Sequence, residues 1–307
     1  MNNFYWTVYK NLEKELTDLS NLIHIDDEQL GIYSIKIAEL LLRTSVEIES
    51  ISKTLYYQNG GTKPDDINLF FDTDCLDLLE SKFLLSKKQV QVSATNFYFT
   101  LPENQILTPL KKANKRGTSS SDWQKAYQAV KHNRVKSLSK GNLKNLIRAL
   151  SALYILNLYL NDNVYQLDKD SSGVNFDSNV GSSIFSIKLH INQTISVNQD
   201  YSKNKDFDEC VYLLKATEDT RNAVQQKLKE LNEKTIERTK TNLLEEITKR
   251  LAETQITNQD EVNEKIKSIS EQINIDNMIQ VARENGQALK ITFDGLRYEA
   301  ILNKHQY

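Results

Sequence analysis

The chain has 307 residues, which is the length of about two domains. Hydrophobic residues make up 39% and charged residues 26%, and the low counts of 9 Gly and 3 Pro argue against a loop-rich all-β fold. The net charge of −2 identifies no partner. Because no apolar stretch is long enough to span a bilayer and no signal peptide is evident, we expect a cytoplasmic protein that does not enter membranes.

The first part of the chain, residues 1–168, is predicted to be a helical-bundle domain with a small β insertion and a basic face. Helical spacing of apolar residues predicts two helices within residues 1–57, a helix from Trp123 to about Arg134, and a helix from Gly141 to Asn161. Clustered Val, Phe and Tyr residues in 89–101 indicate one or two strands. The predicted fold class is therefore mainly α with small β elements (α+β).

The second part, residues 169–307, is predicted to be an α+β region with long charged helices and a terminal β-hairpin. Residues 183–191 are expected to form a strand, and 288–293 and 296–301 flank an Asp-Gly pair that is typical of a two-residue hairpin turn. Residues 218–275 are rich in charged residues and carry a narrow apolar stripe, formed by Val262, Ile266, Ile269 and Ile273. Such a stripe favours a helical hairpin or coiled coil, which would join two helices of this chain, recruit a protein partner or form a homo-oligomer.

Positive charge is concentrated between Lys111 and Arg148. This window holds eleven Lys and Arg residues and one acid, so its net charge is +10 and that of the remaining chain is −12. Such segregation indicates binding of nucleic acid or a nucleotide, although a solvated surface is the plain alternative. The predicted binding residues are Lys111, Lys112, Lys115, Arg116, Lys125, Lys131, Lys136, Lys140 and Lys144.

Familiar catalytic and metal-binding signatures are absent from the sequence. There is no phosphate-binding Gly-rich loop, no His-Glu-x-x-His and no Gly-x-Ser-x-Gly, and the four histidines and two cysteines have no metal-ligand spacing. We therefore expect neither a cofactor nor a metal.

The end of the helix that begins near Trp123 contains a candidate site. At about 100° per residue, Arg134 is expected on the same core-facing side as Trp123, and His132 on the opposite side. A buried guanidinium needs an anion, and the helix from Ile35 to Ile51 offers Glu39 and Glu47. We predict that Arg134 forms an ion pair with Glu47 or contacts an anionic ligand.

The pattern W-x-x-x-Y-x-x-V-K-H-N-R at 123–134, followed by the apolar helix GNLKNLIRALSALYILNLYL, resembles HEPN-like helical proteins of bacterial abortive-infection and antiviral defence. The resemblance covers about residues 1–165. It implies a four-helix core and the handling of RNA or nucleotides. Active HEPN ribonucleases carry Arg-x(4–6)-His, whereas here His132 precedes Arg134 by two positions.

Three functions follow from these observations. The first is a cytoplasmic nucleic-acid- or nucleotide-binding protein of antiviral defence. The second is a metal-independent HEPN-type ribonuclease, in which His132 is the acid/base and Arg134 or Lys131 stabilises the phosphorane. The third is an interaction subunit that recruits a partner or a second copy through 218–275 and has no catalytic role.

Overall fold

The computed structural model describes residues 4–191, 203–253 and 259–307, and these form two compact units. The first unit comprises 4–191, 203–215 and 299–307, and the second comprises 216–253 and 259–298. The second unit is thus an insertion in the first. This division differs from the boundary expected between residues 168 and 169, because the strands that follow that point complete a sheet of the first unit.

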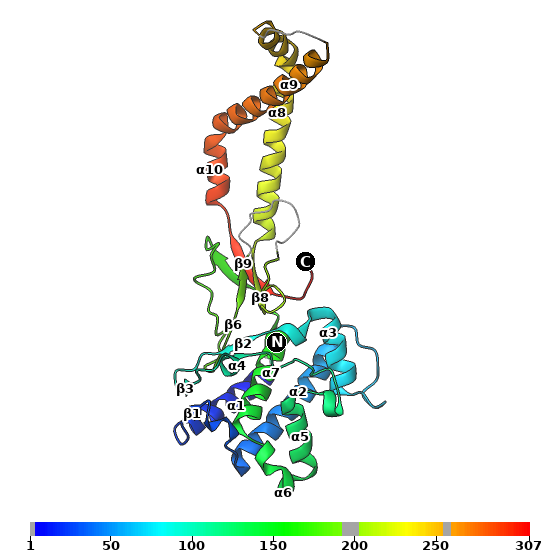
Figure 1. Cartoon of the computed structure of the whole chain (residues 1–307), viewed down its shortest axis with the longest axis vertical. Coiled ribbons are helices and arrows are strands. Elements are labelled where there is room, and N and C mark those ends of the chain that lie inside the picture. Colours follow the sequence, from blue (N-terminus) through cyan, green and yellow to red (C-terminus); the bar gives the residue numbers. More distant parts are fainter. Residues whose placement is uncertain (1–3, 192–202, 254–258) are drawn as a thin grey trace. The chain divides into compact units, whose positions relative to one another are not determined.

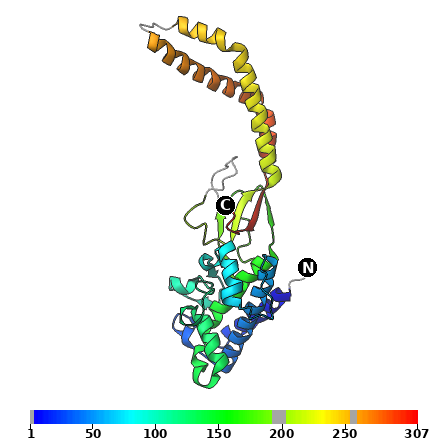
Figure 2. The ribbon, with the colours of Figure 1, turned by 90° about the vertical axis from the view of Figure 1, so that its right-hand side faces the viewer.

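Four helices of the first unit pack against one another: α1 (Phe4–Ser20), α2 (Ile35–Gln58), α5 (Asp122–His132) and α7 (Leu143–Asn161). Figures 1 and 2 show α2 and α7 side by side with α5 against them. α7 is buried on almost every side, from Leu143 to Tyr159, as expected for a helix that is apolar around its circumference.

Short helices and strands connect this bundle to three small sheets. The remaining helical elements of the first unit are η1 (Gln29–Gly31), the π-helix η2 (Phe71–Leu76), α3 (Asp77–Phe83), η3 (Leu85–Lys87), α4 (Pro102–Gln105), η4 (Gly117–Ser119), α6 (Arg134–Ser137) and η5 (Leu138–Lys140). The first sheet pairs β1 (Ile25–Asp26) with β3 (Phe97–Tyr98), and the second has the order β4 (Ile106–Leu107), β2 (Val90–Val92), β6 (Phe185–Ile187). The third has the order β5 (Tyr165–Asp168), β9 (Tyr298–Leu302), β8 (Tyr212–Ala216), β7 (Leu189–Ile191).

The second unit contains α8 (Glu218–Ala252), α9 (Gln259–Glu284) and α10 (Gly286–Asp294). α8 and α9 form the expected helical hairpin, and the ion pairs Arg238–Glu284 and Arg250–Asp276 show that they run antiparallel. Their seam is narrow, because Ile273 and Val281 are the fully buried apolar residues between them in the described part of these helices. No described helix of the chain has the length and apolar character needed to cross a membrane.

The mainly α fold with small β elements is confirmed, as are the strands expected within 89–101 and 183–191. The prediction of a terminal β-hairpin is wrong. Gly295, expected at its turn, has φ −83° and not the positive φ that a two-residue turn requires, and residues 286–294 form α10. Ala288 and Thr292 are both half-buried and are four residues apart, so they lie on the same face of a helix. The helix α10 packs on α8 and α9.

Candidate anion-binding site

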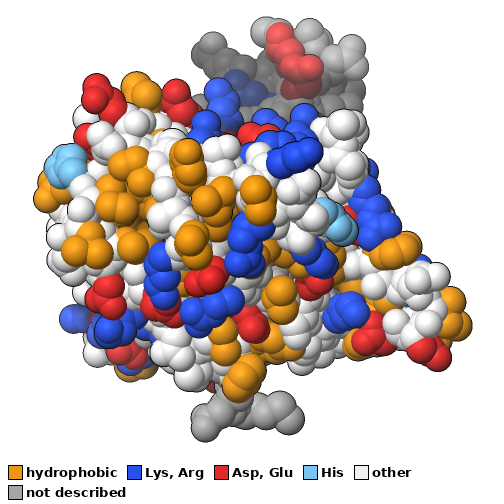
Figure 3. Space-filling model, turned by 90° about the horizontal axis from the view of Figure 1, so that it is seen from below, with side chains coloured by type: hydrophobic (Ala, Val, Ile, Leu, Met, Phe, Trp, Pro, Cys, Tyr) orange, Lys and Arg blue, Asp and Glu red, His pale blue; other side chains and the backbone are white. Residues whose placement is uncertain are grey.

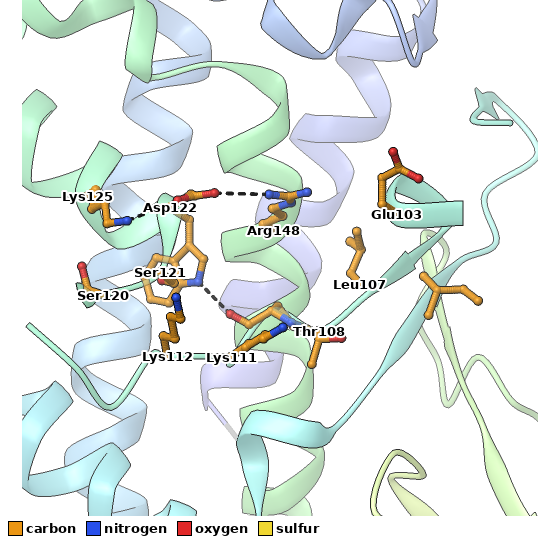
Figure 4. Close-up of a pocket in the computed structure, with 13 residues that line it drawn as sticks. Glu103, Leu107, Thr108, Lys111, Lys112, Ser120, Ser121, Asp122, Lys125 and Arg148 are labelled. Carbon is orange, nitrogen blue, oxygen red and sulfur yellow. Dashed lines mark hydrogen bonds and ion pairs between the residues drawn. The ribbon is translucent and has the colours of Figure 1, made fainter. Parts of the chain in front are cut away.

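The site is a cavity of about 420 Å³ in the first unit, at the beginning of α5. Its walls come from α4, from β4 and the segment that follows it, from the start of α5 and from α7 (Figure 4). The lining residues are Glu103, Ile106, Leu107, Thr108, Pro109, Lys111, Lys112, Ser120, Ser121, Asp122, Trp123, Lys125 and Arg148.

Two buried side chains of α5 hold the segment that carries Lys111 and Lys112. The indole Nε1 of Trp123 donates to the carbonyl of Pro109 at 2.9 Å, and the amide of Gln124 donates to the carbonyl of Ala113 at 2.8 Å. Trp123 is only 1% exposed, so its ring packs in the core and offers no surface for stacking a base. These bonds fix the backbone on both sides of the two lysines.

Four cationic side chains and two carboxylates line the cavity, which gives it a net charge of +2. Asp122 lies 3.4 Å from Lys125 and 3.7 Å from Arg148, and Figure 4 shows it between these two cations. Lys111 and Lys112 are exposed, and neither forms an ion pair with any residue in the described parts of the chain. The excess positive charge therefore resides mainly on these two lysines.

Lys112 has a backbone φ of +63°, in the left-handed region that non-glycine residues seldom adopt. A lysine there costs roughly 1 kcal/mol relative to glycine. Unfavourable backbone conformations of this kind cluster at binding and catalytic sites. The start of α5, by contrast, is already capped, because Ser121 and Gln124 form a capping box. The cationic side chains that this cavity offers an anion are those of Lys111, Lys112, Lys125 and Arg148.

The predicted phosphate-binding residues differ in their position relative to this cavity. Lys111, Lys112 and Lys125 line the cavity, and Lys144 precedes Arg148 by four positions on α7, which places the two on one face of that helix. Lys115, Lys136 and Lys140 are exposed and line no part of the cavity. Figure 3 shows Lys and Arg interspersed with acidic and apolar side chains on the face it displays, so the charged window does not make that face uniformly basic.

Arg116 and Lys131 are engaged by neighbouring side chains. The Nε of Arg116 lies 2.9 Å from both carboxylate oxygens of Asp72, and its guanidinium stacks 3.5 Å from the centre of the Phe70 ring. The ammonium of Lys131 donates to the hydroxyl of Tyr127 at 3.1 Å. For Arg116 this arrangement indicates a structural role beside the π-helix η2.

The prediction that Arg134 faces the core and forms an ion pair with Glu47 is wrong. α5 ends at His132, and Asn133 breaks the helix with φ −149° and ψ 76°, so Arg134 begins α6 with a new orientation. Its side chain is 48% exposed, and its Nη1 lies 3.9 Å from Glu39. Glu47 remains half-buried, and burial raises its pKa, although the nearby Arg43 acts in the opposite direction. His132 is also exposed, so neither member of the proposed catalytic pair is held in a buried site.

Two residues that line the cavity, Glu103 and Arg148, are not among the binding residues predicted from the sequence. Glu103 precedes the basic window by eight positions, and no local pattern in the sequence connects it with the cations. Arg148 was recognisable through its position four residues after Lys144 on a helix. The described residues contain no group of three or more His, Cys, Asp or Glu side chains placed to hold a metal ion.

Comparison of the chain with protein-family models, with curated proteins and with solved structures found no match.

Proposed function

We propose that the first unit binds nucleic acid through this cavity and the adjoining Lys144. The observation that carries the proposal is the pair Lys111 and Lys112, two exposed ammonium groups without a carboxylate partner beside a cavity of net positive charge. Phosphate oxygens are the ligands that such groups neutralise, and each contact releases a counterion from the nucleic acid. A role in bacterial antiviral defence is part of the proposal and is supported only by the resemblance of residues 1–165 to HEPN-like proteins.

The test compares the binding of labelled single-stranded RNA and DNA to wild type and to two double variants. Lys111→Gln/Lys112→Gln removes the unpaired charges. Lys82→Gln/Lys87→Gln removes the same number of charges from exposed positions outside the basic window, and is the matched control. At about 50 mM salt we expect the first variant to bind at least tenfold more weakly and the control to bind like wild type. Wild type that binds neither RNA nor DNA, or equal losses in both variants, would contradict the proposal.

We also propose that the second unit associates with a second copy of the chain. Ile275, Met278 and Ile279 lie on one face of α9 and are 44%, 55% and 42% exposed. α9 has six acidic and three basic residues, and its carboxylates already pair with Arg238 and Arg250 of α8. α8 has eight basic and seven acidic residues, so α9 of one copy, with its net negative charge, meets no net repulsion from α8 of another.

Light scattering tests this second proposal directly. We expect wild type to have the mass of a dimer, and Met278→Asp/Ile279→Asp to have that of a monomer with unchanged helical content. A monomeric wild type would contradict the association.

A further inference from the structure

We propose that the cavity holds the terminal phosphomonoester of a nucleic-acid strand, rather than a phosphodiester within it. This inference rests on the proposed function and names the part of the ligand that the cavity selects. Its basis is charge: the lining side chains carry a net +2, and a phosphomonoester carries about −1.5 to −2 at neutral pH. An internal phosphodiester carries one negative charge and would leave the cavity with an uncompensated cation.

The arrangement of cations suits a group with three terminal oxygens. Asp122 pairs with Lys125 and Arg148, whereas the ammonium groups of Lys111 and Lys112 come from the other wall. Figure 4 shows the two lysines on the segment after β4, across from the Asp122–Arg148 pair. The three terminal oxygens of a phosphomonoester provide acceptors for ammonium groups and for a guanidinium, and such charge-assisted hydrogen bonds are stronger than neutral ones.

The size and the walls of the cavity favour one nucleotide. A volume of about 420 Å³ is in the range of sites for small molecules, and it is far smaller than a groove for a duplex. Ile106, Leu107 and Pro109 form an apolar wall against which a sugar or base edge can pack. Lys144, one helical turn from Arg148, is the next cation available to the strand that leaves the cavity.

The test uses oligonucleotides of one sequence with a 5′-phosphate, a 3′-phosphate or no terminal phosphate, measured by anisotropy at the same salt concentration. We expect one phosphorylated form to bind about tenfold tighter than the form without a phosphate, and the two phosphorylated forms show which end is selected. Equal affinities for all three would overturn this inference and leave nucleic-acid binding intact. Failure of all three to bind would overturn the proposed function itself.

A second arm asks whether the cavity is responsible for the discrimination. Lys112→Asn removes the charge and keeps a residue that tolerates positive φ, so the backbone conformation is retained. Lys136→Asn makes the same change at an exposed position of the basic window outside the cavity. We expect the preference for a terminal phosphate to be lost in the first variant and kept in the second. Loss in both variants, or in neither, would contradict a site at the cavity.

A third arm separates a strand end from a free nucleotide. Trp123 lines the cavity, and Trp6 is the other of the two tryptophans, so Trp6→Phe leaves Trp123 as a fluorescent reporter. A nucleoside monophosphate should change this fluorescence and compete with the phosphorylated strand, but with at least tenfold lower affinity, because it lacks the contacts outside the cavity. Equal affinity would show that the strand contributes nothing and would overturn the inference.

Discussion

Glu13 is a buried carboxylate with an unusually complete set of donors. It is 1% exposed and accepts hydrogen bonds from the Tyr9 hydroxyl at 2.8 Å, from the Ser183 amide at 2.8 Å, and from Ser182 and Lys10. Burial raises the pKa of Glu13, but the hydrogen bonds from Lys10, Ser182 and Tyr9 outweigh it and the net pKa is lowered. Glu13 therefore fastens the segment around Ser182 to α1. Nothing in the local sequence indicates this, since Glu13 stands among the charged residues of the run Lys10–Glu15.

Replacing Glu13 with Gln should destabilise the protein by about 1 to 3 kcal/mol and should remove part of its pH dependence. Because the pKa of Glu13 is depressed in the folded state, its contribution is fully present above the ordinary carboxyl pKa of about 4.3 and is lost as the pH falls through the folded value. Denaturant titrations from neutral pH to below pH 4 would measure both effects. Glu28→Gln, at an exposed position, is the control, and equal pH dependence in Glu13→Gln and wild type would refute this assignment.

Arg134 and His132 should both tolerate replacement by Ala, with losses of about 0.5 kcal/mol or less, because both side chains are exposed. A buried ion pair with Glu47 would have made Arg134→Ala cost roughly 3 to 5 kcal/mol. Thermal melting of Arg134→Ala and His132→Ala measures the loss of stability and distinguishes an exposed Arg134 from one in a buried ion pair. An assay of RNA cleavage on the same samples addresses the ribonuclease hypothesis, which predicts an activity in wild type that His132→Ala abolishes.

The sequence predicts those helices and strands whose apolar residues follow a regular spacing. It does not predict a helix end that a single residue sets, or a segment whose structure depends on packing against a neighbour. The helix α7 is predictable because it is buried throughout and its apolar residues are correspondingly dense. The end of α5 is not predictable, because the helical spacing of residues continues past Asn133, where the helix ends. The run 288–293 satisfies both a strand period and a helix period, and its packing on α8 and α9 selects the helix. The cations of the cavity lie in a basic stretch that the sequence makes visible, whereas the way in which α4, β4, α5 and α7 fold around them follows from tertiary packing.

The seam between α8 and α9 should depend on Ile273 far more than on Ile275. Ile273 is 2% exposed and Ile275 is 44% exposed, so truncation to Ala leaves a cavity in one case and alters a surface in the other. We expect Ile273→Ala to cost about 2 to 4 kcal/mol and Ile275→Ala less than about 0.5 kcal/mol. Hydrogen exchange of α8 and α9 reports the local loss. Equal protection in the two variants would show that the hairpin is not held by this seam.

The chain returns to its first unit after completing the second. Backbone bonds from Thr217 to the Arg297 carbonyl and from Asn303 to the Val211 carbonyl indicate an antiparallel register between β8 and β9. β9 lies between β5 and β8, and the fully buried Asn303 after it donates to the carbonyls of Phe207 and Cys210. The last residues of the chain are therefore part of the first unit.

This topology predicts opposite outcomes for two shortened chains. Replacing residues 218–296 with Asn-Gly should close β8 and β9 into a hairpin and keep both a cooperative melt and nucleic-acid binding. A chain that ends at residue 217 should lose both, because β9 and Asn303 are missing from the sheet. Calorimetry and anisotropy on the two chains measure this. Cooperative melting of the chain ending at 217 would contradict the assignment of β9 to the first unit.

The salt dependence of binding shows whether Lys111 and Lys112 contact phosphate. For wild type and for Lys111→Gln/Lys112→Gln, the logarithm of the association constant would be measured against the logarithm of the salt concentration with one single-stranded oligonucleotide. If the two lysines contact phosphate, the slope of the variant should be shallower by at least about 0.7, the value for one phosphate contact on a single strand. Lys82→Gln/Lys87→Gln should keep the slope of wild type. Identical slopes for all three proteins would show that the cavity does not contact the nucleic-acid backbone.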